Sequence, residues 1–301
     1  MTEKKESFFL SFMLGGISGV IAKTICAPIE RVKLIMQTQD TNPALKGREY
    51  KSMGDCFVRI PKEEGFLSFW RGNMANVVRY FPTQAFNFAF KDFYNRMFNP
   101  YNKHTESGKW FMGNLLAGGM AGSSSMVFVY PLDFARTRLG VDMGKDKSQR
   151  QFHGILDCAS KIYKSDGLAG LYRGFGISVI GIFIYRAFYF GMYDTGKEIL
   201  LTESMKKSMI AKFVFAQLVV MSSETLAYPI DTVRRRMMLQ SGKEVKEYSS
   251  AIDCFQKIIK NEGFSAFFKG NAANITRAFG SSLVLVLYDK MKEVMIEGKS
   301  H

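Results

Sequence analysis

The chain has 301 residues, with 41 Lys or Arg against 27 Asp or Glu and a formal net charge of +14. Hydrophobic residues make up 47% of it and the mean hydropathy is −0.05, which excludes disordered and collagen-like classes. Four Cys without a C-x-x-C pair, together with three His, argue against a disulfide scaffold or a zinc module. The positive excess indicates an anionic partner: nucleic acid, anionic lipid or a small polyanion.

A long apolar stretch opens the chain, and five more follow it. Each has at least 20 residues, which is enough to cross ~30 Å of hydrocarbon at ~1.5 Å per residue. Buried helices of a soluble protein would give similar stretches, but six of them would leave little chain to cover them. We therefore predict six membrane-spanning helices, over Phe8–Gln37, Met74–Phe98, Trp110–Leu139, Ile177–Leu200, Met209–Leu239 and Ala273–Val294.

The first, third and fifth stretches share the motif Pro-x-acid-x-x-base, which begins at Pro28, Pro131 and Pro229. Proline kinks a helix by removing one hydrogen bond, and an acid and a base three residues apart lie near one face. In a threefold bundle, the acid of one unit can meet the base of the next. Such contacts would form a ring of breakable ion pairs that closes one end of a pore.

A short polar stretch separates the two apolar stretches of each unit. It opens with Asp-Cys, ends at an acid followed by Gly, and is followed by an aromatic residue, a base and Gly. Cys158 and Ile162 are four residues apart, as are Cys254 and Ile258, which is typical of one apolar helix face at a membrane surface. We interpret these Cys as small apolar residues of that face rather than redox groups. Three elements recurring in one order predict three repeats, over residues 7–104, 107–203 and 206–297.

Ionisable side chains recur near the middle of the predicted spanning helices. Lys23 lies five residues before the first motif proline, and Arg79 and Arg277 hold corresponding positions in the second and sixth stretches, where the fourth has Gly181. Charges at this depth are costly, so they indicate a water-filled cavity that receives an anion, with Arg forks suited to phosphate oxygens. A stripe of tyrosines on the fourth stretch either packs helices or forms a wall for a flat base: Tyr185, Tyr189 and Tyr193.

A second recurrence lies at the opposite end of the even-numbered stretches. The fourth has Asp194-x-x-Lys197 and the sixth has Asp289-x-x-Lys292, while the second has Asp92 followed three residues later by Asn95. Two breakable rings at opposite ends of a central site are what alternating access requires.

Over its whole length the sequence resembles the mitochondrial carrier family, and within it the ADP/ATP carrier branch. The family likeness rests on the triplicate proline motif, and the narrower one on RRRMML at residues 234–239 and RYFPTQAFNFAFKD at residues 79–92. The resemblance implies an all-α membrane protein with six transmembrane helices in three pseudo-threefold repeats, each carrying an amphipathic helix on the matrix side. It also implies electrogenic exchange of cytosolic ADP for matrix ATP, both without magnesium, across the mitochondrial inner membrane, with both termini towards the intermembrane space.

The resemblance assigns roles to individual residues. The implied substrate-binding residues are Lys23, Arg79, Asn87, Lys91, Gly181, Ile182, Tyr185, Arg186, Arg235 and Arg277. The implied matrix gate consists of Glu30–Arg136, Asp133–Arg234 and Asp231–Lys33, with Gln37 as a brace. The implied cytoplasmic gate consists of Asp92–Lys197, Asp194–Lys292 and the remaining acid Asp289. The implied cardiolipin-binding residues are Ser52, Arg71, Gly72, Gly154, Arg173, Gly174, Ser250, Lys269 and Gly270.

The sequence departs from the family pattern at several positions. Asn95 stands where a base is usual, which predicts a cytoplasmic gate that opens more easily. Glu224 stands in the fifth helix where a small residue is usual, and a carboxylate at that depth needs a partner or an aqueous face. Leu239 replaces a Met in the hexapeptide, and two Ser replace Gly at cardiolipin sites, where they can still cap a helix.

Other functions remain as alternatives. A carrier of the same fold could take phosphate or another nucleotide, and the chain could serve as a structural subunit of a larger respiratory assembly in the inner membrane. An enzyme is disfavoured because the sequence has neither G-x-x-x-x-G-K-S/T nor H-E-x-x-H, and the basic run at residues 234–236 flanks a spanning helix rather than suggesting nucleic acid. We expect no metal or cofactor apart from bound cardiolipin, and one set of three repeats makes a monomer sufficient.

Overall fold

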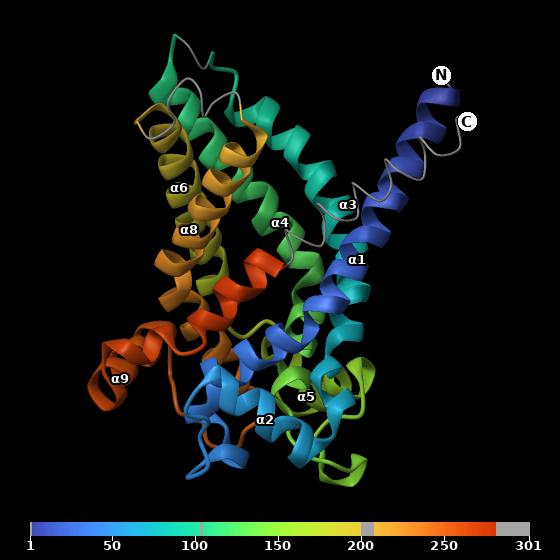
Figure 1. Ribbon diagram of the computed structural model, residues 1–301, viewed down its shortest axis with the longest axis vertical. Coiled ribbons are helices and arrows are strands. Elements are labelled where there is room, and N and C mark those ends of the chain that lie inside the picture. Colours follow the sequence, from blue (N-terminus) through green and yellow to red (C-terminus); the bar gives the residue numbers. More distant parts are fainter. Residues whose placement is uncertain (1, 103–104, 200–207, 281–301) are drawn as a thin grey trace.

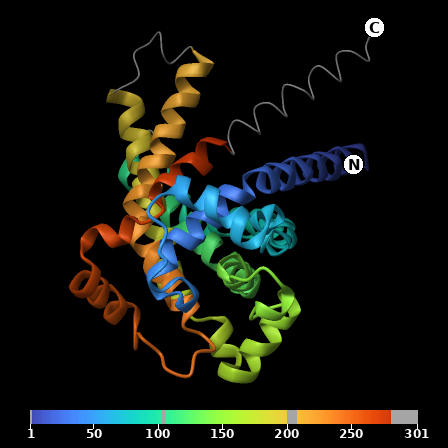
Figure 2. The ribbon, with the colours of Figure 1, turned by 60° about the horizontal axis from the view of Figure 1, so that its bottom comes forward.

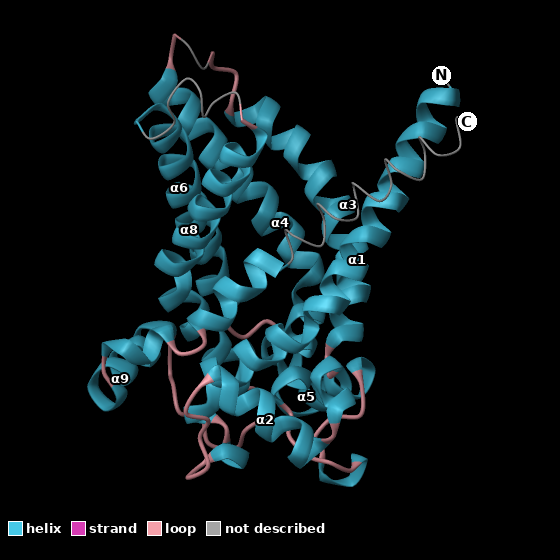
Figure 3. Ribbon diagram, viewed as in Figure 1, coloured by secondary structure: helices cyan, strands magenta, loops and turns pink. Residues whose placement is uncertain are grey.

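In the computed structural model, residues 2–102, 105–199 and 208–280 are described, and the regular elements among them are all helices (Figure 3). Five are long: α1 (Thr2–Thr38), α3 (Asn73–Phe98), α4 (Ser107–Val141), α6 (Phe175–Ile199) and α8 (Met209–Leu239). They match the first five predicted spanning helices, and α8 has the predicted bounds. Residues 271–280 begin the sixth predicted helix, and the rest of that prediction lies outside the described residues.

Hydropathy alone identifies only part of this arrangement. Among the described residues, three helical segments are long and apolar enough to cross a membrane: Ser107–Val141, Phe175–Tyr193 and Ile210–Leu239. The mean hydropathy of α1 and α3 is lowered by polar and charged residues such as Lys23, Glu30, Arg79 and Asn87, which face a central cavity. A helix that lines a wet cavity is therefore less apolar than one surrounded by lipid.

The three short helices lie together at one end of the bundle (Figure 1): α2 (Met53–Glu64), α5 (Ile155–Leu171) and α9 (Ala251–Glu262). Short 3₁₀ helices follow α2 and α9, namely η3 (Phe66–Trp70) and η5 (Phe264–Phe268). In the second repeat, α5 covers the equivalent segment as well, but it is kinked at Gly167, whose φ of 67° and ψ of −161° are not helical. The predicted amphipathic helices are thus present in all three repeats.

A reciprocal cap fixes the start of α2 and of α9. The Ser52 hydroxyl accepts a hydrogen bond from the Asp55 amide, 3.2 Å away, and the Asp55 carboxylate accepts one from the Lys51 amide at 3.1 Å. Ser250 and Asp253 repeat the pattern at the start of α9. Because side-chain oxygens satisfy amides that lack helical partners, this variant of the capping box holds each helix start in place.

Each short helix buries its apolar face against the nearby half of a long helix. In the first repeat, Cys56 and Ile60 pack with Val32 and Ile35 of α1. Corresponding clusters join α5 to α4 and α9 to α8, and Cys56, Cys158 and Cys254 are each fully buried in them. This confirms that the three cysteines belong to apolar helix faces.

Three long helices of different repeats, α1, α4 and α8, lie in contact with one another. The N-terminal half of α1 leans away from α6 and α8 in both views (Figures 1 and 2). With the short-helix end brought forward, α5 and α9 lie on different sides of the bundle (Figure 2).

Candidate functional site

A cavity of about 580 Å³ occupies the centre of the bundle. Its walls come from α1, α3, α4, α6, α8 and residues 271–280, so every repeat contributes. Among the described residues, eight cationic side chains and three carboxylates line it. Nine of the ten predicted substrate-binding residues are among the lining: Lys23, Arg79, Asn87, Gly181, Ile182, Tyr185, Arg186, Arg235 and Arg277. Lys91, the tenth, is exposed on the outer part of α3 and is not among them.

The floor of the cavity is closed by the proline-motif ring, the three ion pairs that join the motifs of successive repeats. Arg136 of α4 binds Glu30 of α1, and Arg234 of α8 binds Asp133 of α4. Lys33 of α1 completes the ring at 3.0 Å from the third acid, Asp231. The structure thus brings together all three pairs that the resemblance implied, each between two different repeats.

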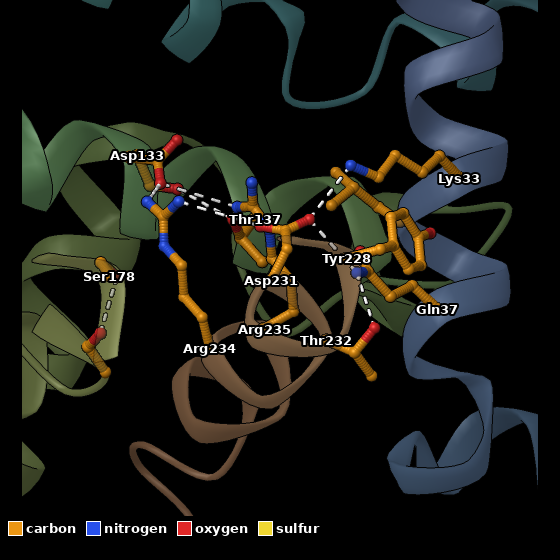
Figure 4. A network of polar contacts seen from close by, with 12 residues as sticks. Lys33, Gln37, Asp133, Thr137, Ser178, Tyr228, Asp231, Thr232, Arg234 and Arg235 are labelled. Carbon is orange, nitrogen blue, oxygen red and sulfur yellow. Dashed lines mark hydrogen bonds and ion pairs between the residues drawn. The ribbon is translucent and has the colours of Figure 1, made fainter. Parts of the chain in front are cut away.

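Gln37 reinforces one of these pairs (Figure 4). Its amide nitrogen donates to the Asp231 carboxylate at 3.2 Å and to the Thr232 hydroxyl at 3.0 Å, and its side chain is buried. The corresponding positions, nine residues after the other two motif prolines, are Gly140 and Met238, which offer no such donor. The Lys33–Asp231 pair is therefore the only one of the three with a brace at this position.

Arg235 connects the ring to the cavity. Its guanidinium lies 3.4 Å from Asp231 and 3.6 Å from Asp133, and it donates to the Thr137 hydroxyl (Figure 4). One cation thus stands between two acids of the ring, which reduces the repulsion between them. The prediction placed Arg235 only among the cavity contacts.

Two of the cations expected to bind phosphate lie above the ring. Lys23 is 3.6 Å from Glu30, and Arg79 is 3.6 Å from Asp133. These carboxylates are shared, since each is bound more closely by its ring partner. At 3.6 Å the contacts leave both cations well placed to bind an anion that enters the cavity.

The third such cation, Arg277, has a carboxylate of its own. Its Nη2 donates to both oxygens of Glu224, at 2.9 and 3.0 Å, and Asn274 donates to the same carboxylate at 2.9 Å. Glu224 thus has the partner that its depth in the fifth helix requires. The sequence could not identify it, because the two residues are 53 positions apart on different helices.

The aromatic stripe of α6 serves two purposes. Tyr185, Tyr189 and Tyr193 stack in succession, with ring centroids 6.1 and 5.9 Å apart, and Tyr193 packs against Phe215 of α8. The lower two rings line the cavity, whereas Tyr193 does not. The wall that they form with Gly181 is suited to a flat ring.

Arg186 follows Tyr185 on α6 and extends toward α4. An added Cβ at Gly118 of α4 would come within 2.7 Å of its Nη1, so the glycine leaves room for the guanidinium. The cavity therefore combines an aromatic wall with a cation on the same helix.

The second predicted ring falls mostly outside what the structure describes. Asp92 is exposed near the C-terminal end of α3. The side chains of Asp194 and Lys197 are not described, and Asp289 and Lys292 lie outside the described residues. Asn95, which replaces the usual base, accepts a hydrogen bond from Asn99 at 3.4 Å.

The predicted lipid-binding residues are mainly engaged with the protein itself. Arg71, Arg173 and Lys269 each lie near the acid that comes before Gly in the polar stretch of their own repeat, at 2.5, 3.7 and 4.0 Å, and Lys269 lies closer to Asp40, at 2.7 Å. The glycines that follow them have positive φ and lie against the next repeat's long helix: Gly72, Gly174 and Gly270. Ser52 and Ser250 cap helices, and Gly154 holds the same place before α5.

Two networks of ion pairs lie beside the ring, at residues that the proline motif does not mark. Arg31 is almost fully buried and binds Glu64 at 2.9 Å, which also binds Arg71. In the third repeat, Arg236 binds Glu262 and lies 3.1 Å from Asp40 of the first repeat. The recurring acid before Gly was the available signal, but only the structure shows which cation it meets.

The chemistry of the site is the binding of an anion. Among residues 2–102, 105–199 and 208–280, no group of three or more His, Cys, Asp or Glu is placed to hold a metal ion. The cation excess, the aromatic wall and the closed floor are suited to a ligand that has a charged end and a flat, uncharged end.

Comparisons with known proteins agree with this architecture. The family model for mitochondrial carrier protein matches three consecutive segments, residues 4–102, 107–204 and 205–299. The chain is 55% identical over 291 residues to ADP/ATP translocase 4 of Mus musculus, covering 96% of this chain and 91% of the relative. It is 52% identical over 299 residues to ADP/ATP translocase 3 of Homo sapiens, covering 98% of this chain and 100% of the relative.

Proposed function

Because the chain belongs to the mitochondrial carrier family, we propose that it exchanges ADP for ATP across the mitochondrial inner membrane. Relatives more than half identical over nearly the whole chain are named ADP/ATP translocases, which makes it a transporter rather than an enzyme. The observation that carries the proposal is the central cavity, which is lined both by Lys23, Arg79 and Arg277 and by the wall at Gly181 and Tyr185. A nucleotide has the matching chemistry, with phosphates at one end and a flat base at the other.

The mechanism is alternating access. The ring of ion pairs near the short helices corresponds to the matrix gate and is closed, so the cavity opens toward the cytosolic side. Phosphate oxygens draw Arg79 away from Asp133, which removes a contact between the first two repeats, and their negative charge repels the ring acids Glu30 and Asp133 nearby. Substrate binding and the opening of the matrix gate are coupled through these shared acids.

Finer points of the proposal follow from the charges and from the family. Free ATP carries about one negative charge more than free ADP, so their exchange without magnesium moves net charge and responds to membrane potential. Both termini face the intermembrane space, a single chain is the working unit, and cardiolipin binds beside the short helices. Amides at the starts of these helices support lipid-phosphate binding, although Asp55 and Asp253 occupy part of that space.

The test is nucleotide exchange in liposomes that contain the purified full-length protein. Liposomes loaded with ADP should take up labelled ADP and ATP but not AMP, and a potential positive outside should change the ATP uptake rate. Arg79→Ala should abolish exchange, because Arg79 is the cation that α3 contributes to the cavity lining among the described residues.

Two outcomes would contradict the proposal. Exchange of phosphate or another anion, without adenine nucleotide uptake, would assign a different substrate to the same fold. Absence of exchange with every anion, combined with copurification in a larger assembly, would favour a structural role.

A further inference from the structure

Glu224 stands at a position that holds a different kind of side chain in each of the three repeats. It lies five residues before Pro229, as Lys23 lies five before Pro28, and the second repeat has Met126 there. All three positions line the central cavity. One structural position is thus a cation, an apolar residue and an anion in the three repeats, so the charge of the cavity differs from wall to wall.

The carboxylate of Glu224 differs from the others around the cavity. Glu30, Asp133 and Asp231 each belong to the proline-motif ring and are bound there by a cation of the next repeat. Glu224 binds Arg277 and Asn274 instead, both on the neighbouring helix of its own repeat. Its removal therefore leaves every ion pair of the ring intact.

Arg277 can bind a phosphate while it is paired with Glu224, but the pairing lowers its affinity for that phosphate. Both hydrogen bonds that Arg277 donates to Glu224 use Nη2, whereas a guanidinium presents five donors. The side chains are 17% and 24% exposed, so a ligand reaches them. A phosphate on the remaining donors comes within a few ångströms of the Glu224 carboxylate, and like charges repel at that distance.

This repulsion distinguishes nucleotides by charge. ATP brings about one more negative charge than ADP, so Glu224 disfavours ATP more strongly than ADP. We propose that Glu224 is a specificity-determining residue of the cavity, which holds Arg277 in the absence of substrate and shifts the preference from nucleoside triphosphate toward diphosphate. The inference rests on the proposed nucleotide exchange and names a residue that sets its selectivity.

The test compares KM for ADP and for ATP in liposomes that contain the full-length protein, held at zero membrane potential with ADP inside. Glu224→Gln removes the charge and keeps a hydrogen-bonding side chain. We expect KM to fall for both nucleotides and the ratio of KM for ADP to KM for ATP to rise by about 3–10-fold. Glu224→Asp, which keeps the charge, should retain the wild-type ratio.

Glu63→Gln is the matched control. It removes the same charge from α2, outside the cavity, where Glu63 pairs with Arg48 and Arg59. Its ratio should equal that of the wild type, which separates a local effect from a change of net charge. If Glu224→Gln does not fold, Glu224→Ala supplies the same comparison through the equilibrium binding of ADP and ATP.

The outcomes separate this inference from the proposed function. If Glu224→Gln changes both KM values by the same factor, the ratio of KM for ADP to KM for ATP stays unchanged. This result would show that Glu224 only supports the helix contact and would overturn its role in specificity. If the wild-type protein exchanges no adenine nucleotide, the proposed function fails before the variants are compared.

Discussion

Single hydrogen bonds at the floor of the cavity have predictable effects on stability. Gln37 makes two, to Asp231 and Thr232, and its side chain is buried. Gln37→Met keeps the volume but removes both, at a cost of about 1–2 kcal/mol to the closed state. We expect a lower unfolding temperature in detergent without nucleotide. Gln151→Met, at an exposed loop position, is the control, and equal unfolding temperatures would contradict the role of Gln37 as a brace.

The buried thiols of the short helices offer a second test. Burial raises the pKa of Cys56, Cys158 and Cys254 to about 12 each, from an ordinary value near 9. At pH 8 the folded protein then has about a thousandfold less thiolate at these positions than the unfolded chain. Mass spectrometry after treatment with N-ethylmaleimide should show them unmodified until detergent denaturation, and rapid modification of the native protein would disprove this.

The same pKa shifts predict loss of stability at alkaline pH. Because the thiols ionise near pH 9 when unfolded and near pH 12 when folded, their contribution to stability is complete below pH 9 and is lost as the pH rises toward 12. The wild-type unfolding temperature should therefore fall more steeply over this range than that of a variant in which all three cysteines are alanine. Parallel curves would contradict this prediction.

For single residues, the sequence shows which side chains carry charge but does not predict which partners they contact. The ion pairs of the ring were predictable, because a motif repeated three times places an acid and a base at the same position in each repeat. Glu224 and Arg277, or Arg31 and Glu64, carry no such mark, since their partners are set by helix packing. A residue that departs from the repeat, as Glu224 does, is identified by sequence, and its contact is found only in three dimensions.

At the scale of elements, the glycines that follow the short helices connect neighbouring repeats. Gly270 has a φ of +84°, and an added Cβ would lie 2.9 Å from the Lys33 carbonyl oxygen and 3.0 Å from the Tyr228 hydroxyl. Gly270→Ala should cost more than the ~1–2 kcal/mol of a left-handed residue, because it also collides with α1. The measurement is thermal unfolding in lipid-free detergent.

Gly176→Ala provides the matched control for this substitution. Gly176 lies within α6 with nothing within 4 Å of an added Cβ, so alanine should leave stability unchanged or raise it by up to about 1 kcal/mol. If both variants unfold at the same temperature, Gly270 has no packing role. A loss seen only when cardiolipin is present would favour lipid binding instead.

Element boundaries were predictable where composition changes sharply. α8 has the predicted limits because a polar loop follows Leu239, and α4 extends only a few residues beyond them. The kink of α5 at Gly167 lies where the sequence pattern ends the short polar stretch, because Gly167 takes a positive φ there as Gly65 and Gly263 do. Contacts between elements, such as Arg236 with Asp40, depend on how three repeats close on one another.

At the scale of the whole molecule, access to the cavity from one side is testable. In a variant without native cysteines, Asn87→Cys lies in the cavity wall above the ring. A membrane-impermeant maleimide on the cytosolic side should label it, and ADP should protect it. Ala44→Cys lines a second cavity, of about 670 Å³, beside the short helices, where residue 44 is exposed, and it should label only from the matrix side. Equal labelling of both from the cytosolic side would contradict a closed floor.

The walls that the three repeats contribute to the cavity carry unequal charge. Above the ring, Lys23 and Arg79 make the first repeat's wall positive, Arg186 adds one positive charge to the second beside the uncharged surface of Tyr185 and Gly181, and the Glu224–Arg277 pair makes the third nearly neutral. A field therefore runs across the pore as well as along it. A ligand that is charged at one end orients in that transverse field. A scaffold with threefold pseudosymmetry therefore binds an asymmetric molecule in one orientation rather than three.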